Sequence, residues 1–246
     1  MTKVKALGTG GAFTKYYHNN YVFELGKRKL LVDAGTSLRY SLHAAGYKES
    51  DITDIVITHL HSDHVGGLEE FAQRCKWIYN HKPTLWIRSE LAEGLLQIIS
   101  KGLCTDGLYL SDYFDVVFKE DGFVIDLYEI EFLKTDNLHA KNMLSMGIKI
   151  NDIKGNSNVI FTSDIAKHEE AQFDGMFEHN TVALFHDISM VPNAVHSYIE
   201  DVIEYYKDKF DLSKIYGMHY QDDTNLEEVE EKYGIKMVRL DKVYEF

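Results

Sequence analysis

The feature that most constrains the fold of this chain is a group of histidines placed directly after a short apolar strand. Residues 54–58 (DIVIT) predict a buried strand, and His59, His61, Asp63 and His64 follow it at once. His59 and His61 stand two positions apart, so in extended backbone both side chains project to the same side. Burying three imidazoles and a carboxylate without an ion would leave several polar groups unpaired. The cluster therefore predicts a metal site at the end of a strand.

Strands and helices are expected to alternate along the whole chain. Apolar and β-branched runs between turn residues predict strands at residues 4–7, 21–25, 29–33, 54–58, 84–87, 115–119, 129–135, 146–150, 159–163, 182–185 and 214–218. Helical spacing predicts helices at residues 37–45 and 225–233, and further helices capped by Ser89 and Asn193. No linker rich in Pro, Gly or Ser interrupts the pattern. The sequence therefore predicts an α/β fold in which residues 1–246 form a single domain.

Composition narrows the classes of protein to which the chain can belong. Its 246 residues include 16 Tyr and 13 Phe, enough to fill a sizeable core. The formal net charge of -13 argues against a partner that is a long nucleic acid, since such a partner calls for a basic face. No apolar stretch predicts a membrane span or a secretory signal. The two cysteines, Cys75 and Cys104, predict no disulfide framework, and we expect a reducing cytoplasm.

The H-x-H-x-D-H motif after an apolar strand resembles the signature of the metallo-β-lactamase superfamily. The resemblance extends downstream, where His139, Asp164 and His219 each adjoin a predicted strand in the order that the superfamily shows. It implies a four-layer αββα sandwich with a binuclear metal site, supported from behind by Asp33 of the LLVDAG segment. The implied ligands are His59, His61 and His139 for one ion, Asp63, His64 and His219 for the other, and Asp164 as the bridge.

Imidazole and carboxylate ligands favour two Zn²⁺ ions, with Mn²⁺ as an alternative. His61 stands where the di-iron flavoprotein relatives have Glu, which also favours zinc. Asp164 rather than Cys argues against the zinc β-lactamases themselves. Two ions in such a site polarise a substrate oxygen and lower the pKa of a water between them. The resemblance therefore implies a binuclear metal-dependent hydrolase.

Three segments resemble the ribonuclease Z branch of the superfamily, whose members process the 3′ end of tRNA. They are residues 7–13 (LGTGGAF), residues 182–187 (VALFHD) and His139 with the strand that follows it. In that branch the histidine of the second segment faces the scissile phosphate. The resemblance implies that His186 protonates the leaving oxygen and that Asp187 orients it. The expected catalytic residues are therefore His186, Asp187 and, within the metal site, Asp63.

The chain departs from the tRNA-processing enzymes in the segment between His139 and Asp164. Those enzymes often carry a long basic arm there that clamps tRNA, whereas this segment reads as a simple hairpin. The same motifs resemble the small ribonuclease Z-like cyclic-nucleotide phosphodiesterases, which include the phage-associated anti-Pycsar proteins. The resemblance implies hydrolysis of 3′,5′-cyclic nucleotides such as cyclic CMP and cyclic UMP, which silences a bacterial defence signal. It also implies a homodimer that acts in the cytoplasm, or in the host cytoplasm if a phage encodes it.

Residues that contact the substrate are harder to predict from one sequence. Aromatic side chains that could stack on a base, and that are equally typical of a core or a dimer interface, are Tyr16, Tyr17, Tyr109, Tyr113 and Phe114. His18 and Asn19 are candidates for contact with the phosphate. The histidines that belong to no motif, and that we expect on the surface or in packing, are His43, His81, His168, His179 and His196.

Three other functions remain to be distinguished from cyclic-nucleotide hydrolysis. A tRNA 3′-end processing enzyme requires an RNA-clamping arm, which the sequence does not show. A thioester or lactone hydrolase shares the HLHSDHVGG motif but has no need of a pair such as His186 and Asp187. A non-catalytic protein that only sequesters a nucleotide is expected to lack some of the ligands, and all seven are present.

Overall fold

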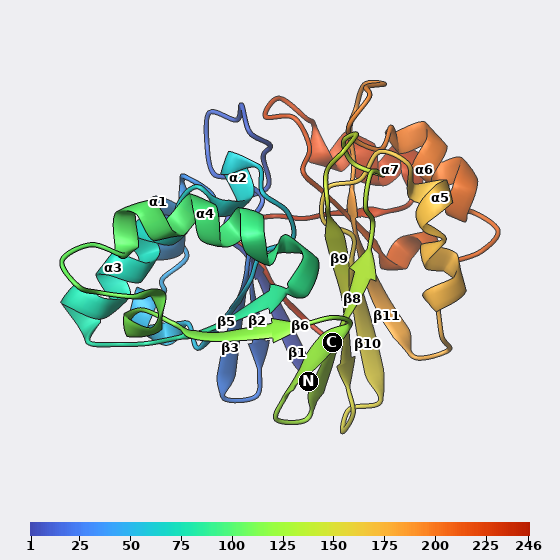
Figure 1. Cartoon of the computed structure of the whole chain (residues 1–246). Helices are drawn as coiled ribbons and strands as arrows, with labels where there is room; N and C mark the ends of the chain where they lie inside the picture. The colour runs from blue at the N-terminus through green and yellow to red at the C-terminus, as the bar shows by residue number, and fades with distance from the viewer.

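Two seven-stranded β-sheets pack face to face in the computed structural model, which describes residues 1–246 (Figure 1). The first sheet runs in spatial order through β14 (Val243–Glu245), β1 (Thr2–Ala6), β2 (Tyr21–Leu25), β3 (Arg28–Val32), β4 (Asp54–Val56), β5 (Thr84–Arg88) and β6 (Asp115–Lys119). The second runs through β13 (Lys236–Met237), β12 (Ile215–Met218), β11 (Thr181–Asp187), β10 (Ser157–Phe161), β9 (Met146–Asp152), β8 (Tyr128–Lys134) and β7 (Gly122–Ile125).

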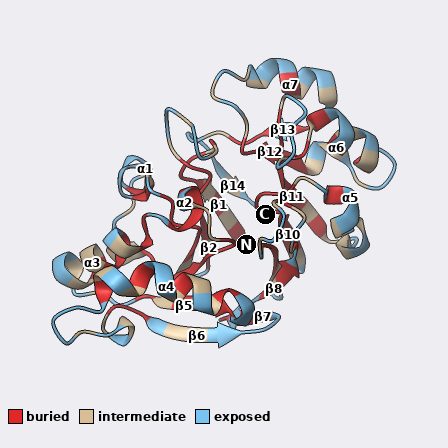
Figure 2. Cartoon of the chain, turned by 45° about the horizontal axis from the view of Figure 1, so that its top comes forward, coloured by how far each residue is buried: buried red, intermediate tan, exposed pale blue.

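Helices cover the outer face of each sheet. The first sheet is covered by α1 (Leu38–Ala44), α3 (Leu68–Tyr79) and α4 (Ala92–Leu103), and the second by α5 (His168–Ala171), α6 (Ile199–Tyr206) and α7 (Leu226–Tyr233). The short α2 (Ser62–Val65) follows β4. Figure 2 shows that the outer sides of these helices are exposed. The order helix, sheet, sheet, helix is the four-layer αββα sandwich predicted from the sequence. No helix combines the length and the apolar character needed to cross a bilayer.

Alternation of side chains along the strands produces three separate layers of core. In β3, Leu30 and Val32 point between the sheets, while Leu31 points toward the helices of the first half. In β11, Phe185 points between the sheets and Leu184 points toward the helices of the second half. This period of two follows from the pleat of a strand. It fixes which face of a sheet receives each residue at a strand end.

Every strand predicted from the sequence is present, within a few residues of its predicted bounds. The short edge strands β7, β13 and β14 were not predicted, because two to four residues carry little periodicity. The helix predicted from Asn193 begins later, at Ile199. The Asn193 side chain instead accepts hydrogen bonds from the backbone N–H groups of Val195 (3.0 Å) and His196 (2.7 Å). It therefore closes a turn ahead of the helix, which is a common alternative role for asparagine.

The strand order brings several loops to one edge of the sandwich. Strands β3, β4 and β5 are parallel to one another, as are β10, β11 and β12. The carboxyl ends of parallel strands meet at the same edge of a sheet, which is where open α/β sheets bind ligands. The loops that follow β4, β8, β10 and β12 carry the predicted metal ligands, so the fold assembles them from both sheets.

Candidate metal centre

Three histidines from the two halves of the molecule converge on one point. His59 and His61 lie in the loop after β4, and His139 lies in the loop between β8 and β9. The Nδ1 atom of His61 lies 3.1 Å from Nε2 of His59 and 3.1 Å from Nε2 of His139. Three imidazole nitrogens at this spacing are arranged as ligands of a single ion.

A second group lies beside the first and consists of Asp63, His64, Asp164 and His219. The first two of these residues belong to α2, and the other two follow β10 and β12. Asp164 and His219 therefore come from the second sheet, whereas α2 follows the first. Like the triad of histidines, this group is complete only where the two halves meet.

Asp164 lies between the two groups. Its Oδ2 atom is 3.3 Å from Nε2 of both His64 and His219. The same oxygen is 3.9 Å from Nε2 of His59 and 3.8 Å from Nε2 of His139. This carboxylate oxygen faces both groups of nitrogens, an arrangement compatible with the bridging role that the family resemblance implies for Asp164.

The chemistry of the buried atoms fits a divalent metal pair. The Nε2 atoms of His64 and His219 and the Oδ1 atom of Asp164 are buried, and none has a hydrogen-bond partner in the chain. Unpaired polar atoms in an interior are costly, whereas cations bound among them would satisfy all of them. Imidazole nitrogens together with carboxylate oxygens form a donor set that divalent metal ions accept.

A second layer of hydrogen bonds orients the ligands. Asp33 is fully buried and accepts hydrogen bonds from His64 Nδ1 (2.7 Å), Thr58 N (2.8 Å) and Thr58 Oγ1 (2.8 Å). His139 Nδ1 donates to the backbone oxygen of Val195 (2.7 Å). In His64 and in His139 the hydrogen bond occupies Nδ1 and leaves Nε2 to face the centre. Proteins usually orient ligating histidines in this way.

The backbone around the centre is held in unusual conformations. Asp33, Ser163 and His219 have φ values of +67°, +56° and +62°, in the left-handed region that side-chain-bearing residues seldom adopt. Such strain persists where the surrounding structure dictates it, typically at functional sites. Gly11 of the GTGG segment packs against His219, and a Cβ atom at Gly11 would lie 2.6 Å from Cε1 of that ring. The glycine therefore permits the close approach of the loop to a ligand.

Electrostatics within the centre is dominated by burial and by the carboxylates. Burial lowers the pKa of His59 well below its usual value. Burial also acts to lower the pKa of His219, but the carboxylates of Asp164, Asp63 and Asp187 together outweigh it and raise this pKa to about 9. Asp63 is buried as well, yet the neighbouring imidazoles of His219 and His64 hold its pKa below the usual value. The ligands thus already form a closely coupled set of opposite charges.

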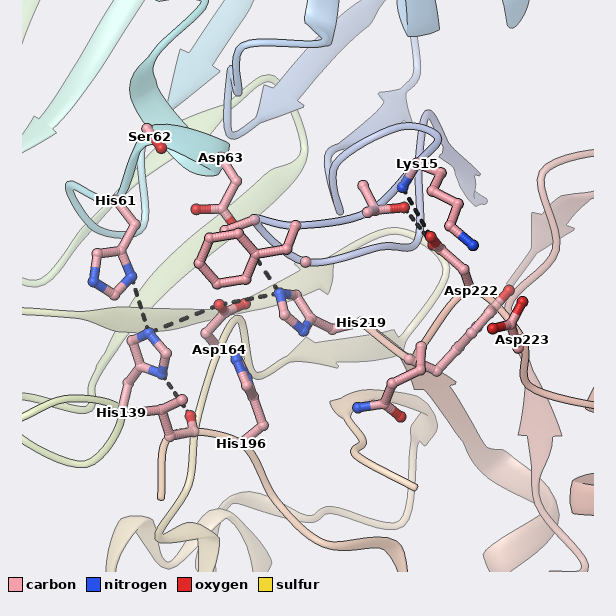
Figure 3. A pocket seen from close by; sticks show the side chains of 17 residues that line it. Lys15, His61, Ser62, Asp63, His139, Asp164, His196, His219, Asp222 and Asp223 are labelled. Carbon is pink, nitrogen blue, oxygen red and sulfur yellow. Dashed lines mark hydrogen bonds and ion pairs between the residues drawn. The ribbon is translucent and has the colours of Figure 1, made fainter. Parts of the chain in front are cut away.

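The centre forms the floor of an open pocket of about 660 Å³ (Figure 3). His61, Asp63, His139, Asp164 and His219 all reach this floor. The rim is formed by residues 11–15, by residues 195–196 and by residues 220–223. A pocket of this size lies in the range of sites that bind small organic molecules.

Comparison with known proteins identifies the family. The sequence model of the family described as Anti-Pycsar protein Apyc1 matches residues 2–244. The chain belongs to this family. An Apyc1 relative from Paenibacillus sp. (strain J14) is 31% identical over 229 residues, which cover 90% of each protein. Another, from Bacillus phage BSP38, is 32% identical over 246 residues, covering 95% of this chain and 93% of the relative.

Comparison with solved structures confirms the fold. The metallo-beta-lactamase fold protein YhfI from Bacillus subtilis superposes with a TM-score of 0.78 at 17% sequence identity, covering 100% of this chain and 99% of YhfI. The predicted metallo-β-lactamase fold is therefore confirmed, as is the predicted resemblance to the anti-Pycsar proteins. At this identity, the likeness to YhfI speaks for the fold alone.

His186 of this Apyc1-family protein does not line the pocket. It shares the helix-facing side of β11 with Leu184, and its ring centroid lies 5.4 Å from that of His168 and 5.5 Å from that of Tyr206. Its Nδ1 donates to the backbone oxygen of Asp187 (2.7 Å). Burial, with His168 nearby, lowers the pKa of His186 to about 3. The role of proton donor expected from the sequence does not fit a neutral ring that is buried between the second sheet and its helices, outside the pocket lining.

His196 lies in the pocket wall, although its sequence context predicts only a surface or packing residue. Its Nδ1 atom is 2.9 Å from Oδ2 of Asp187, and its ring stacks on that of His219 at 4.3 Å between centroids. Burial acts to lower the pKa of His196, but Asp187 outweighs it and raises the pKa. Asp187 was predicted to orient His186, but the side chain that its carboxylate contacts is His196.

The residues expected to contact substrate lie elsewhere. Tyr113 and Phe114 are buried in the core between the first sheet and its helices. Tyr16 and Tyr109 are exposed but lie outside the pocket lining, as does Tyr17. His18 and Asn19 are buried beneath the rim. In their place, the structure brings Phe13 and Lys15 to the pocket.

Proposed function

We propose that this Apyc1-family protein is a metal-dependent phosphodiesterase that hydrolyses 3′,5′-cyclic nucleotides such as cyclic CMP and cyclic UMP to nucleoside monophosphates. By removing such signals it would counteract Pycsar anti-phage defence. The observation that carries the proposal is the convergence of seven metal-capable side chains beneath a small pocket, five of which line its floor, next to a histidine–carboxylate pair. Membership of the anti-Pycsar family supports the choice of substrate.

The proposed ligands are those that the sequence predicts: His59, His61 and His139 for one ion, Asp63, His64 and His219 for the other, and Asp164 for both. Zn²⁺ suits this set of nitrogen and oxygen donors best, and Mn²⁺ is the alternative. When bound, two such ions supply positive charge to the phosphoryl oxygens and activate water for attack at phosphorus. Second-layer residues such as Asp33 and Thr58 hold the ligands in place.

We assign protonation of the leaving ribose oxygen to His196. A ring nitrogen of His196 lies within 4.8 Å of ligand atoms of His139 and Asp164, so the ring reaches the floor of the pocket. Asp187 accepts a hydrogen bond from His196 Nδ1 and is itself fixed by the backbone N–H of Ile165 (2.8 Å). Nε2 then remains to deliver a proton to the alkoxide, which is a poor leaving group at neutral pH without one.

The decisive experiment incubates the purified protein, loaded with zinc or manganese, with a panel of 3′,5′-cyclic mononucleotides and with an unprocessed tRNA precursor. The His64→Ala variant serves as the control, since it removes one ligand. We expect the cyclic nucleotides to be opened by the wild type alone and the tRNA to remain intact. Cleavage of the tRNA alone would contradict the proposal.

The structure offers no support for the alternative of tRNA processing. Between His139 and Asp164 the chain forms the antiparallel hairpin of β9 and β10, and no additional arm extends from it. If neither substrate is cut, thioesters and lactones are the substrates to test next, because other enzymes of the same fold hydrolyse them.

The family resemblance also supports a homodimer built from single-domain chains, residues 1–246, working in the cytoplasm, or in the host cytoplasm for a phage-encoded protein. Light scattering coupled to size-exclusion chromatography tests the first part. We expect a mass twice that of the 28.4 kDa chain. A mass equal to that of one chain at micromolar concentration would refute the dimer.

A further inference from the structure

We propose that Phe13 is the platform on which the base of the substrate stacks, an inference that rests on the proposed function. The side chain of Phe13 is 100% exposed, and it lines the same pocket as the metal ligands. It is the most exposed of the large hydrophobic residues of the chain. A fully exposed phenylalanine beside a polar floor provides a flat apolar face with no partner in the chain.

The loop that carries Phe13 is anchored by hydrogen bonds on both sides of this residue in the sequence. After Phe13, the Thr14 hydroxyl and the backbone N–H of Lys15 (2.8 Å) both donate to the carboxylate of Asp222. Before Phe13, the backbone N–H of Gly10 donates to the backbone oxygen of Tyr17 (3.1 Å). Figure 3 shows Lys15 and Asp222 joined at one end of the pocket. The exposed ring is therefore presented on an anchored loop, which limits the entropy lost when a ligand binds.

The direction in which a cyclic nucleotide must bind places its base at this ring. Its phosphodiester is the reacting group and belongs at the floor, among His61, Asp164 and His219. The base is the part farthest from the phosphate, so it projects toward the rim. Phe13 lines one side of the pocket, and the half-exposed Val195 supplies a second apolar side chain next to His196. Stacking recognises the π-face that every base has, so this contact favours nucleotides without selecting among bases.

Steady-state kinetics of Phe13→Ala on two substrates tests the inference. One substrate is 3′,5′-cyclic CMP, and the other is the 3′,5′-cyclic phosphate of 1-deoxyribose, which lacks a base. Loss of a stacked base typically costs a factor of about 5 to 150. We expect that loss in kcat/KM for cyclic CMP, mainly through KM, no change for the abasic ester, and recovery in Phe13→Trp. Tyr16→Ala is the matched control, because Tyr16 is an exposed aromatic of the same loop outside the pocket lining.

Several results would overturn the inference. An equal loss on both substrates would mean that Phe13 shapes the loop, and no loss on either would mean that the base lies elsewhere. A smaller assembly for Phe13→Ala in size-exclusion chromatography would make the ring a contact between copies. If the wild type opens the abasic ester and no cyclic nucleotide, the proposed function fails together with this inference, whereas the first three results leave the proposed function intact.

Discussion

Two histidines ten positions apart have opposite surroundings. His186 is fully buried on the side of β11 that faces the helices, among other aromatic rings. His196 is partly exposed and lies beside the proposed ligands. Both histidines form a hydrogen bond with Asp187. His186 bonds to its backbone oxygen, and His196 bonds to its carboxylate. The Asp187 carboxylate outweighs burial and raises the pKa of His196, whereas the hydrogen bond to the Asp187 backbone oxygen is too weak to offset the burial that lowers the pKa of His186 to about 3.

Replacing His196 by alanine should lower kcat for cyclic nucleotides by a factor of about 10² to 10⁴, since a general acid contributes that much. The bound metal, measured by atomic absorption, should stay at the wild-type level because His196 is not among the proposed ligands. His179→Ala provides the control, as that side chain is exposed and remote from the pocket lining. Undiminished turnover in His196→Ala would disprove the assignment.

Asp33→Asn should weaken metal binding about 10- to 100-fold, because the amide replaces the charged acceptor that orients His64 Nδ1. Competition against a chromophoric chelator measures the affinity. Asp126→Asn is a matched control: Asp126 is exposed and, like Asp33, has a positive φ of 52°. Equal affinities for the two variants would show that Asp33 serves the fold rather than the ligands.

Among the elements, the loop between β8 and β9 depends on a residue from the other sheet. Arg88, at the end of β5, donates to both carboxylate oxygens of Asp136 (2.7 and 2.6 Å) and to the backbone oxygen of Ser145 (3.0 Å). The guanidinium is buried, and the loop that it holds carries His139. This contact ties a ligand-bearing loop of the second half to the first.

Arg88→Ala should lower the free energy of unfolding by about 3 kcal/mol, because it removes a buried guanidinium together with its ion pair to the partly buried Asp136 carboxylate and its hydrogen bond to the Ser145 carbonyl. Urea denaturation of the metal-free protein measures the change. Arg39→Ala removes an exposed ion pair with Glu70 and should cost less than about 1 kcal/mol. A loss for Arg88→Ala as small as that of the control would mean that water replaces the guanidinium.

Which features could be predicted from the sequence depends on whether their signal is local. The strands and the group His59, His61, Asp63 and His64 were predictable, because pleat alternation and ligand spacing are written in consecutive residues. Asn193 was misinterpreted because its side chain can accept from a helix or from a turn with equal ease. The pairing of Asp187 with His196 depends on how that turn packs against β11. The position of the Phe13 ring at the pocket depends on where its loop is anchored. Only the tertiary structure reveals these two features.

For the whole molecule, neither half contains a complete set of ligands. One group draws His59 and His61 from the first half and His139 from the second, and the other group is divided in the same way. Bound ions therefore connect the two sheets as well as supplying chemistry. Stability of the entire sandwich should respond to them.

Removing the metal with a chelator should lower the melting temperature by about 5–15 °C, as expected for losing a ligand present at 100 to 1,000 times its dissociation constant. Differential scanning calorimetry with and without added zinc measures the shift. His64→Ala should show a much smaller response to chelator. A melting temperature that is unaffected by chelator in the wild type would mean that the ions do not stabilise the contact between the sheets.

The division of the ligands between the two sheets has a consequence for the order of events in the cell. Synthesis delivers the first sheet's histidines early, but His219 follows β12, near the end of the chain. A nascent chain on the ribosome thus offers only fragments of each ligand set, and these bind an ion weakly. Metal acquisition must wait until β12 has been synthesised and the two halves have docked, so the protein becomes an enzyme only after it has folded.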